Sequence, residues 1–147
     1  MRQGYYKLPL RLSSFFEENG GQLDKCSELE SIDQHIEMLL TTCPGEHHFD
    51  SDFGCRIWEL DFQVIASLEQ WEKLFKQYIY ESIAKYETRL ANLSLDIYLR
   101  EVVKEERANC SMAVRKRADV YVAAQLISTD EPVKFRYTLY LGPLSNE

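Results

Sequence analysis

A change of hydrophobic period constrains the fold of this 147-residue chain more than any other feature. From residue 67 to about residue 87, apolar side chains recur every three or four positions, as on one face of a helix. Three later segments, 93–99, 120–126 and 133–141, alternate apolar and polar residues, which is typical of strands with one buried face. Consecutive strands after helices favour an α+β fold, with helices packed on a three-stranded antiparallel meander, and disfavour a doubly wound nucleotide-binding fold.

An earlier helix is predicted over residues 31–42. Ser31 and Gln34 have the spacing of a capping box, in which two side chains satisfy free amide groups reciprocally. Pro44 and Gly45 favour a turn directly after this helix. The residues expected on its buried face are Ile32, Ile36, Leu39, Leu40 and Cys43.

Two further helical signals follow. A short helix is predicted over residues 55–60, where Ile57 and Trp58 would add bulk to the core. Ser67 and Gln70 form a second capping-box pattern at the start of the long helix.

The N-terminal region is expected to be peripheral. Apolar residues alternate over residues 6–12, which predicts an extended segment, and Pro9 restricts it to a sheet edge or a docked arm. We therefore divide the chain into an N-terminal arm and loop, residues 1–30, and a single α+β domain, residues 31–147.

Composition narrows the class of protein. The formal net charge of −7 opposes binding to a phosphate backbone, and the only basic cluster is residues 115–117. No signal peptide or membrane-spanning segment is recognisable, so a soluble, cytoplasmic protein is expected, without direct membrane insertion. Four irregularly spaced cysteines then predict reduced thiols without disulfides.

Carboxylates near the bend after residue 44 are the sharpest enzymatic signal. Glu46, Asp50, Asp52 and Glu59 could supply an acid and a base for glycoside hydrolysis, as in a peptidoglycan hydrolase. Carboxylates are common on a chain in which 28% of residues are charged, and nothing in the pattern indicates one that is desolvated. No catalytic residue is predicted.

A metal site is the second chemical alternative. Cys43, His47, His48 and Cys55 could fill a tetrahedral zinc shell, but their spacing matches no familiar zinc pattern. Both cysteines also suit buried positions as small hydrophobes. We expect no metal, no cofactor and no small-molecule substrate.

The segment between residues 39 and 55 carries, in order, a leucine-rich helix end, threonine, a Pro-Gly-Glu turn and a Phe-Gly pair: Leu39, Leu40, Thr41, Thr42, Pro44, Gly45, Glu46, Phe53 and Gly54. This order resembles the gene-25-type baseplate wedge family of contractile phage tails, whose relatives include the TssE subunit of type VI secretion. His47 stands where the family has arginine.

The end of the long helix carries a second resemblance. Residues 86–89 are similar to the Tyr-Glu-Pro-Arg signature of the same family, with Thr88 in place of proline, while Glu87 and Arg89 are present. The resemblance covers about residues 31–141.

The resemblance implies a structural baseplate subunit of a contractile injection system. Such a subunit joins other wedge proteins and offers sheet edges to the sheath protein, templating sheath assembly by strand addition. Type VI secretion is favoured, and a phage or phage-like tail is the alternative. Glu46, Glu87 and Arg89 are the implied protein-contact residues.

Two groups of residues complete the expected site. Lys134 and Arg136 lie on the polar face of the last strand, which is expected to be an edge open to a partner strand. The residues expected to shape the turn are Pro44, Gly45, Phe53 and Gly54.

Overall fold

The computed structural model describes residues 4–18, 21–60, 68–106 and 111–141. Its elements, in chain order, are β1 (Tyr5–Tyr6), the 3-10 helix η1 (Leu12–Phe16), β2 (Lys25–Cys26), α1 (Glu28–Thr41), the 3-10 helix η2 (Arg56–Glu59), α2 (Leu68–Tyr86), β3 (Leu90–Glu106), β4 (Ser111–Leu126) and β5 (Pro132–Leu141). None of the helices in these ranges has both the length and the apolar character needed to cross a bilayer.

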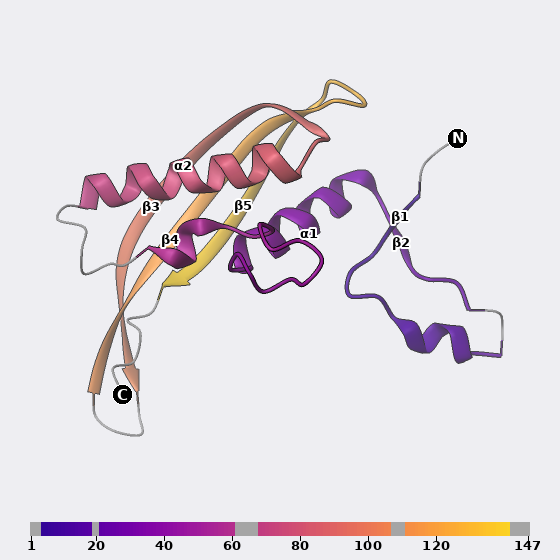
Figure 1. Cartoon of the computed structure of the whole chain (residues 1–147), viewed down its shortest axis with the longest axis horizontal. Coiled ribbons are helices and arrows are strands. Elements are labelled where there is room, and N and C mark those ends of the chain that lie inside the picture. Colours follow the sequence, from indigo (N-terminus) through magenta and orange to yellow (C-terminus); the bar gives the residue numbers. More distant parts are fainter. Residues whose placement is uncertain (1–3, 19–20, 61–67, 107–110, 142–147) are drawn as a thin grey trace.

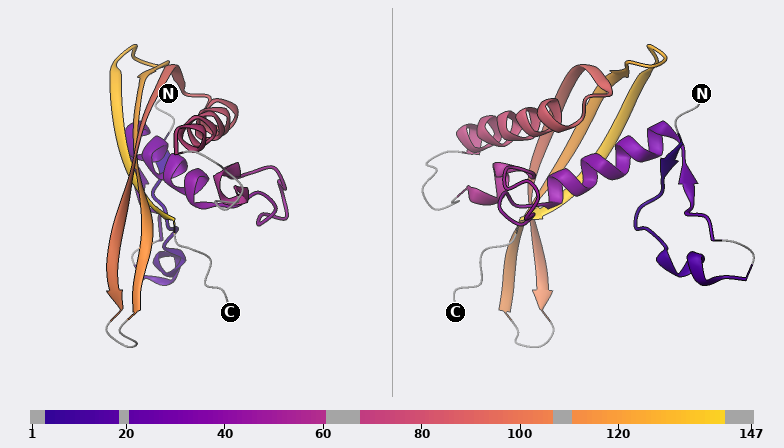
Figure 2. Two further views of the ribbon diagram at one scale, coloured as in Figure 1. Left: turned by 90° about the vertical axis from the view of Figure 1, so that its left-hand side faces the viewer. Right: turned by 45° about the vertical axis from the view of Figure 1, so that its right-hand side comes forward.

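The last three strands form an antiparallel sheet in the order β3-β4-β5. In the register of this sheet, Val122 lies opposite Leu95 on one side and Phe135 on the other. Both helices, α1 and α2, lie on the same face of the sheet (Figure 2, left). The predicted α+β class and three-stranded meander are therefore confirmed.

The core lies between this face and the two helices. Phe75, Ile79 and Ile83 of α2 are fully buried, as the helical period predicts. Burying an aliphatic or aromatic side chain of this size contributes about 1.5–3 kcal/mol. The buried side chains that the sheet supplies alternate along its strands and include Leu95, Val120, Val122, Phe135, Tyr137, Leu139 and Leu141.

The start of the first helix differs from the prediction. Helix α1 begins at Glu28 with Ser27 as its N-cap, and the capping box joins Ser27 to Glu30, not Ser31 to Gln34. The Glu30 amide donates to Ser27 Oγ and the Ser27 amide to Glu30 Oε2, each at 3.2 Å. Two serines in this region precede a glutamate or glutamine by three residues, and the upstream pair forms the cap.

Replacing the cap residue gives a first prediction. Ser27→Ala is expected to lower the free energy of unfolding by about 1 kcal/mol, because the Glu30 amide loses its acceptor. Ser27→Asn keeps a side-chain oxygen and should leave stability nearly unchanged. Urea denaturation of the two variants measures the difference, and equal losses would contradict the assignment of Ser27 as the cap.

The N-terminal prediction is wrong in extent. Of the expected extended segment, residues 6–12, only Tyr6 lies in a strand, and that strand, β1, pairs with β2, which the sequence pattern did not reveal. The Leu8–Pro9 peptide bond is cis, and η1 follows it. Pairing with β2 requires the chain to turn back, so β1, η1 and β2 project together beyond the N-terminal end of α1 (Figure 1).

The short helix after the turn is also corrected. Residues Arg56–Glu59 form a single 3-10 stretch and no α-helix. Ile57 is fully buried, whereas Trp58 is 38% exposed and donates from Nε1 to the Leu40 carbonyl at 2.8 Å. For α2, the predicted capping box at Ser67 lies outside the described residues; the helix ends at Tyr86, one residue before its expected end.

Candidate functional site

Glu87, directly after α2, is the centre of a buried polar network. Its side chain is 1% exposed. Oε1 accepts from the Arg89 amide at 3.2 Å and from Arg89 Nε at 2.8 Å, and Oε2 accepts from Arg89 Nη2 at 2.9 Å. The carboxylate is therefore held by its near neighbour in a two-pronged contact.

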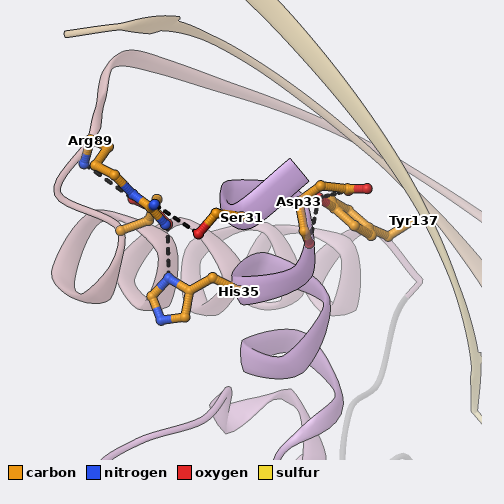
Figure 3. Close-up of polar contacts among 6 residues, drawn as sticks. Ser31, Asp33, His35, Arg89 and Tyr137 are labelled. Atoms are coloured by element: carbon orange, nitrogen blue, oxygen red, sulfur yellow. Dashed lines mark hydrogen bonds and ion pairs between the residues drawn. The ribbon is translucent and has the colours of Figure 1, made fainter. Parts of the chain in front are cut away.

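Helix α1 supplies the other half of the network (Figure 3). His35 Nδ1 lies 2.8 Å from Glu87 Oε2, and Arg89 Nη1 donates to Ser31 Oγ at 3.0 Å. Ser31 and His35 are one helical turn apart, so they face the same neighbour. The Arg89 guanidinium also lies 4.9 Å from the centre of the Tyr5 ring, so the network joins α1, the exit of α2 and β1.

These contacts set the ionisation of Glu87. Burial raises the pKa of the carboxyl, but hydrogen bonds from His35 and Arg89, together with the charge of Arg89, outweigh burial and lower the pKa to about 2. Glu87 is consequently an acceptor-only carboxylate at neutral pH, and His35 Nδ1 is the donor in their contact. This arrangement fixes the end of α2 against α1.

The turn between α1 and η2 packs against this network. Phe53 lies edge-on to Tyr86, with ring centres 5.1 Å apart, and stacks on His35 at 6.1 Å. His47, which stands where the resembling family has arginine, lies edge-on to Phe53 at 5.1 Å. The two segments that carry the resemblance therefore meet in space through Phe53, although more than 30 residues separate Phe53 from Glu87.

Two glycines allow the turn to close. Gly45 and Gly54 have φ angles of 96° and 130°, which side chains rarely adopt. The Gly45 amide donates to the Ser51 carbonyl at 2.7 Å. Gly54 lies directly against the backbone of Thr42, and Ser82 of α2 donates from Oγ to the Gly54 carbonyl at 3.0 Å. The turn is thereby fastened to both helices.

The remaining predicted contact residues lie elsewhere. Glu46 is exposed on the turn, whereas Lys134 and Arg136 are exposed on the polar face of β5. The structure therefore joins Glu87, Arg89 and the turn into one region and leaves the two β5 cations apart from it.

Sequence reasoning missed Ser31 and His35 as members of the network. The sequence pattern indicates Ser31 as a helix cap and does not single out His35. Their spacing of four residues on one helix face was the available signal, but it does not identify the partner.

The predicted carboxylates are only partly brought together. Asp52 and Glu59, with Glu81, line a groove of about 310 Å³ between the turn and α2, whereas Glu46 and Asp50 do not line it. All three groove carboxylates are exposed. Lys85 lies 3.8 Å from Asp52, and the guanidinium of Arg56 lies 3.5 Å from Glu59.

The four cysteine and histidine residues considered for a metal differ in burial: Cys55 is buried, Cys43 is half-buried, and His47 and His48 are exposed. Within the described residues, no group of three His, Cys, Asp or Glu side chains is placed to hold a metal ion. Cys55 is fully buried, and its burial raises the pKa of the thiol, which favours the neutral form over a thiolate ligand. Cys26, Cys43 and Cys55 are free thiols, and Cys110 lies outside the described residues.

Comparisons with known proteins agree with this geometry. A solved structure from Geobacter sulfurreducens, a protein that carries the provisional name tail lysozyme, superposes with a TM-score of 0.58 at 22% identity, covering 82% of this chain and 96% of that one. At this identity the similarity shows the fold. Among curated proteins, none matches the sequence. Residues 26–131, which include the turn and the Glu87 network, match the family described as baseplate wedge protein gp25, and the chain belongs to that family.

Proposed function

We propose that the chain is a structural, non-enzymatic subunit of the baseplate of a contractile injection system, of the type VI secretion class, where it links wedge proteins in the bacterial cytoplasm. The family match over residues 26–131 carries this proposal. The boundary expected at residue 30 falls inside α1, so the arm outside the wedge domain would end before the cap residue Ser27. The acidic balance, with a net charge of −7, suits protein partners better than nucleic acid.

The open edges of the β3-β4-β5 sheet support a role in templating the sheath. β3 and β5 are the two edge strands. Among the described residues other than Tyr140, no backbone hydrogen bond is found between the outer side of either strand and another segment. Amides and carbonyls that are already aligned at a strand edge lower the ordering cost of adding a strand from the sheath protein.

The Glu87 network has a positioning role in this proposal. Glu87 is buried and satisfied within the chain, so it acts by holding Arg89 and the turn. The Arg89 side chain is 23% exposed and would lie at the rim of the proposed contact, and Glu46 is exposed on the turn. Contacts of this kind set register and orientation more than affinity.

Deletion of the gene tests the proposed function. Fluorescently tagged sheath protein should then form no sheaths, and the wild-type gene should restore them. Arg89→Lys should restore them only in part, because lysine cannot make the two-pronged contact with Glu87. Lys76→Arg on the exposed side of α2 is the matched control and should restore sheaths fully.

Normal sheaths in the deletion strain would exclude the proposed function. Neighbouring genes separate the two kinds of machine, because capsid genes favour a phage tail and an AAA+ disassembly ATPase favours secretion.

Peptidoglycan hydrolysis is a second candidate, since the groove brings Asp52 and Glu59 to one surface. Both carboxylates are exposed and lie near a cation, so the groove lacks a desolvated acid that would hold a proton at neutral pH. We expect purified protein to release no muropeptides from cell wall. Release that is lost in Glu59→Gln but kept in Glu46→Gln would instead establish the hydrolase.

A further inference from the structure

The sheet has an outer face, turned away from α1 and α2, that no described helix covers (Figure 2, left). The strand register places the outer-face side chains in a grid: Ser94, Asp96, Tyr98 and Arg100 on β3, Ala123, Tyr121, Asp119 and Arg117 on β4, and Lys134, Arg136, Thr138 and Tyr140 on β5. The family match does not say what this face does.

Three tyrosines lie on the outer face, one on each strand. Tyr98, Tyr121 and Tyr140 are 55%, 38% and 52% exposed. Tyr98 lies edge-on to Tyr121 with ring centres 5.7 Å apart, and the Arg136 guanidinium lies 5.5 Å from the centre of the Tyr121 ring. Tyrosine and arginine are enriched at the energetically dominant centres of protein interfaces. The outer face therefore has the composition of such a centre.

A buried carboxylate orders the middle of this face. Asp119 is 1% exposed although it points away from the core. Its Oδ1 accepts from Thr138 Oγ1 at 3.0 Å and from Arg117 Nε at 3.1 Å, and Arg136 Nη2 lies 4.0 Å away. Burying a carboxylate is costly unless it is paired. Here the pairing holds two guanidinium groups in place before any partner arrives.

Beside the tyrosines the outer face is hollowed. A depression of about 480 Å³ is lined by residues that include Ser94, Tyr98, Tyr121, Ala123 and Lys134. The small residues Ser94 and Ala123 lie opposite each other, next to the bulky tyrosines. The hollow can take an apolar side chain from a partner, with the Lys134 ammonium at its edge.

The charge of the outer face is opposite to that of the chain. Arg100, Lys134 and Arg136 are cations, Asp96 is an anion, and Arg117 is matched by Asp119. The grid is thus net positive on a chain whose formal charge is −7. We propose that the outer face is a docking surface for an acidic segment of a different protein subunit, with an apolar side chain in the hollow and carboxylates on Lys134 and Arg136.

Charge also decides against two other occupants. A phosphate backbone carries a negative charge at every nucleotide, so some of its phosphates would lie near Asp96 in the hollow, whereas a short peptide can place carboxylates on Lys134 and Arg136 alone. Two copies of this chain repel each other because each carries a net charge of −7. If the outer face of one copy bound an acidic surface elsewhere on a second copy, the contact would be head-to-tail and would not form a closed dimer. The proposal relies on the proposed baseplate function only for the identity of the partner.

In the first test, isotope-labelled protein is titrated with a short amphipathic peptide of leucine, alanine and glutamate, and NMR monitors the amide shifts. Amide shifts should gather on the outer face, and the peptide should bind about tenfold more tightly than a version with glutamine for glutamate. Lys134→Glu with Arg136→Glu should weaken binding about tenfold, and high salt should do the same.

Lys7→Glu with Lys25→Glu is the matched control, because it changes the net charge equally at exposed positions of the projecting β1–β2 region. This control should bind as the wild type does, and circular dichroism checks that both double variants fold. The proposal would be overturned if the glutamine peptide bound as tightly as the glutamate peptide, or if the amide shifts lay away from the outer face. Shifts of the same size with a thymidine oligonucleotide would overturn it too.

The second test identifies the partner. A photo-crosslinking residue in place of Tyr121, in protein co-expressed with the other baseplate subunits, should capture a peptide rich in aspartate and glutamate. Capture of this same chain, or of a basic peptide, would overturn the proposal. If the wild type co-purifies with no baseplate subunit, the proposed function fails, while the peptide titration still decides the outer face.

Discussion

Gly54→Ala is expected to lower the free energy of unfolding by about 3–5 kcal/mol, combining backbone strain with overpacking. The φ angle of Gly54 is 130°, and an added Cβ would lie 2.5 Å from the Thr42 carbonyl oxygen and 3.0 Å from the Pro44 nitrogen. These are backbone atoms at the end of α1, so they cannot rotate away. The added methyl would push the turn off both helices, and urea or thermal denaturation measures the loss.

Gly45→Ala is the matched control for this prediction. Gly45 also has a positive φ, 96°, but a Cβ there would meet no atom within 4 Å. Only the backbone strain remains, so the expected loss is about 1–2 kcal/mol. Equal losses at Gly45 and Gly54 would contradict the claim that close approach to Thr42 fixes the turn.

Glu87→Gln is expected to cost about 3 kcal/mol at neutral pH, because it leaves the partly buried Arg89 guanidinium without its counter-charge. Exposed Glu81 on α2 is the matched control, and Glu81→Gln should change stability by less than about 0.5 kcal/mol. Chemical denaturation of the three proteins tests this. A similar small effect at both positions would show that the network contributes little.

The same carboxylate gives a pH dependence with a definite sign. The pKa of Glu87 falls from an ordinary 4.5 to about 2 on folding, so its contribution is fully present above about pH 4.5 and is lost as the pH falls towards 2. The difference between wild type and Glu87→Gln should therefore shrink through this window. A difference that stays constant from neutral to strongly acidic pH would contradict the assignment.

The sheet and the helix faces were predictable because burial is periodic. Alternation in residues 120–126 and 133–141 identifies the second half of β4 and nearly all of β5, and the expected side chains are buried apart from Val133, which is half-buried. Boundaries were less predictable, since capping patterns at Ser27 and Ser31 compete and local sequence does not say which one forms.

Asp119 shows another limit of local pattern. Alternation assigns it to the wet face, but cross-strand Thr138 and neighbouring Arg117 bury it. The contact of Glu87, at the end of α2, with α1 was also unpredictable, because α1 lies far away in the sequence. His35 and Glu87 are 52 residues apart, and no local period reports such a contact. The turn motif and the helix-end motif could be recognised separately, whereas their meeting at Phe53 required the fold.

One carboxylate that serves several donors makes their energetic contributions interdependent. Once Glu87 is lost, further loss of its partners His35 or Arg89 removes little, so the costs of single substitutions do not add. Joint replacement of the three side chains is consequently easier to tolerate than any path of single steps. Evolutionary drift in this wedge subunit would therefore alter the three positions together.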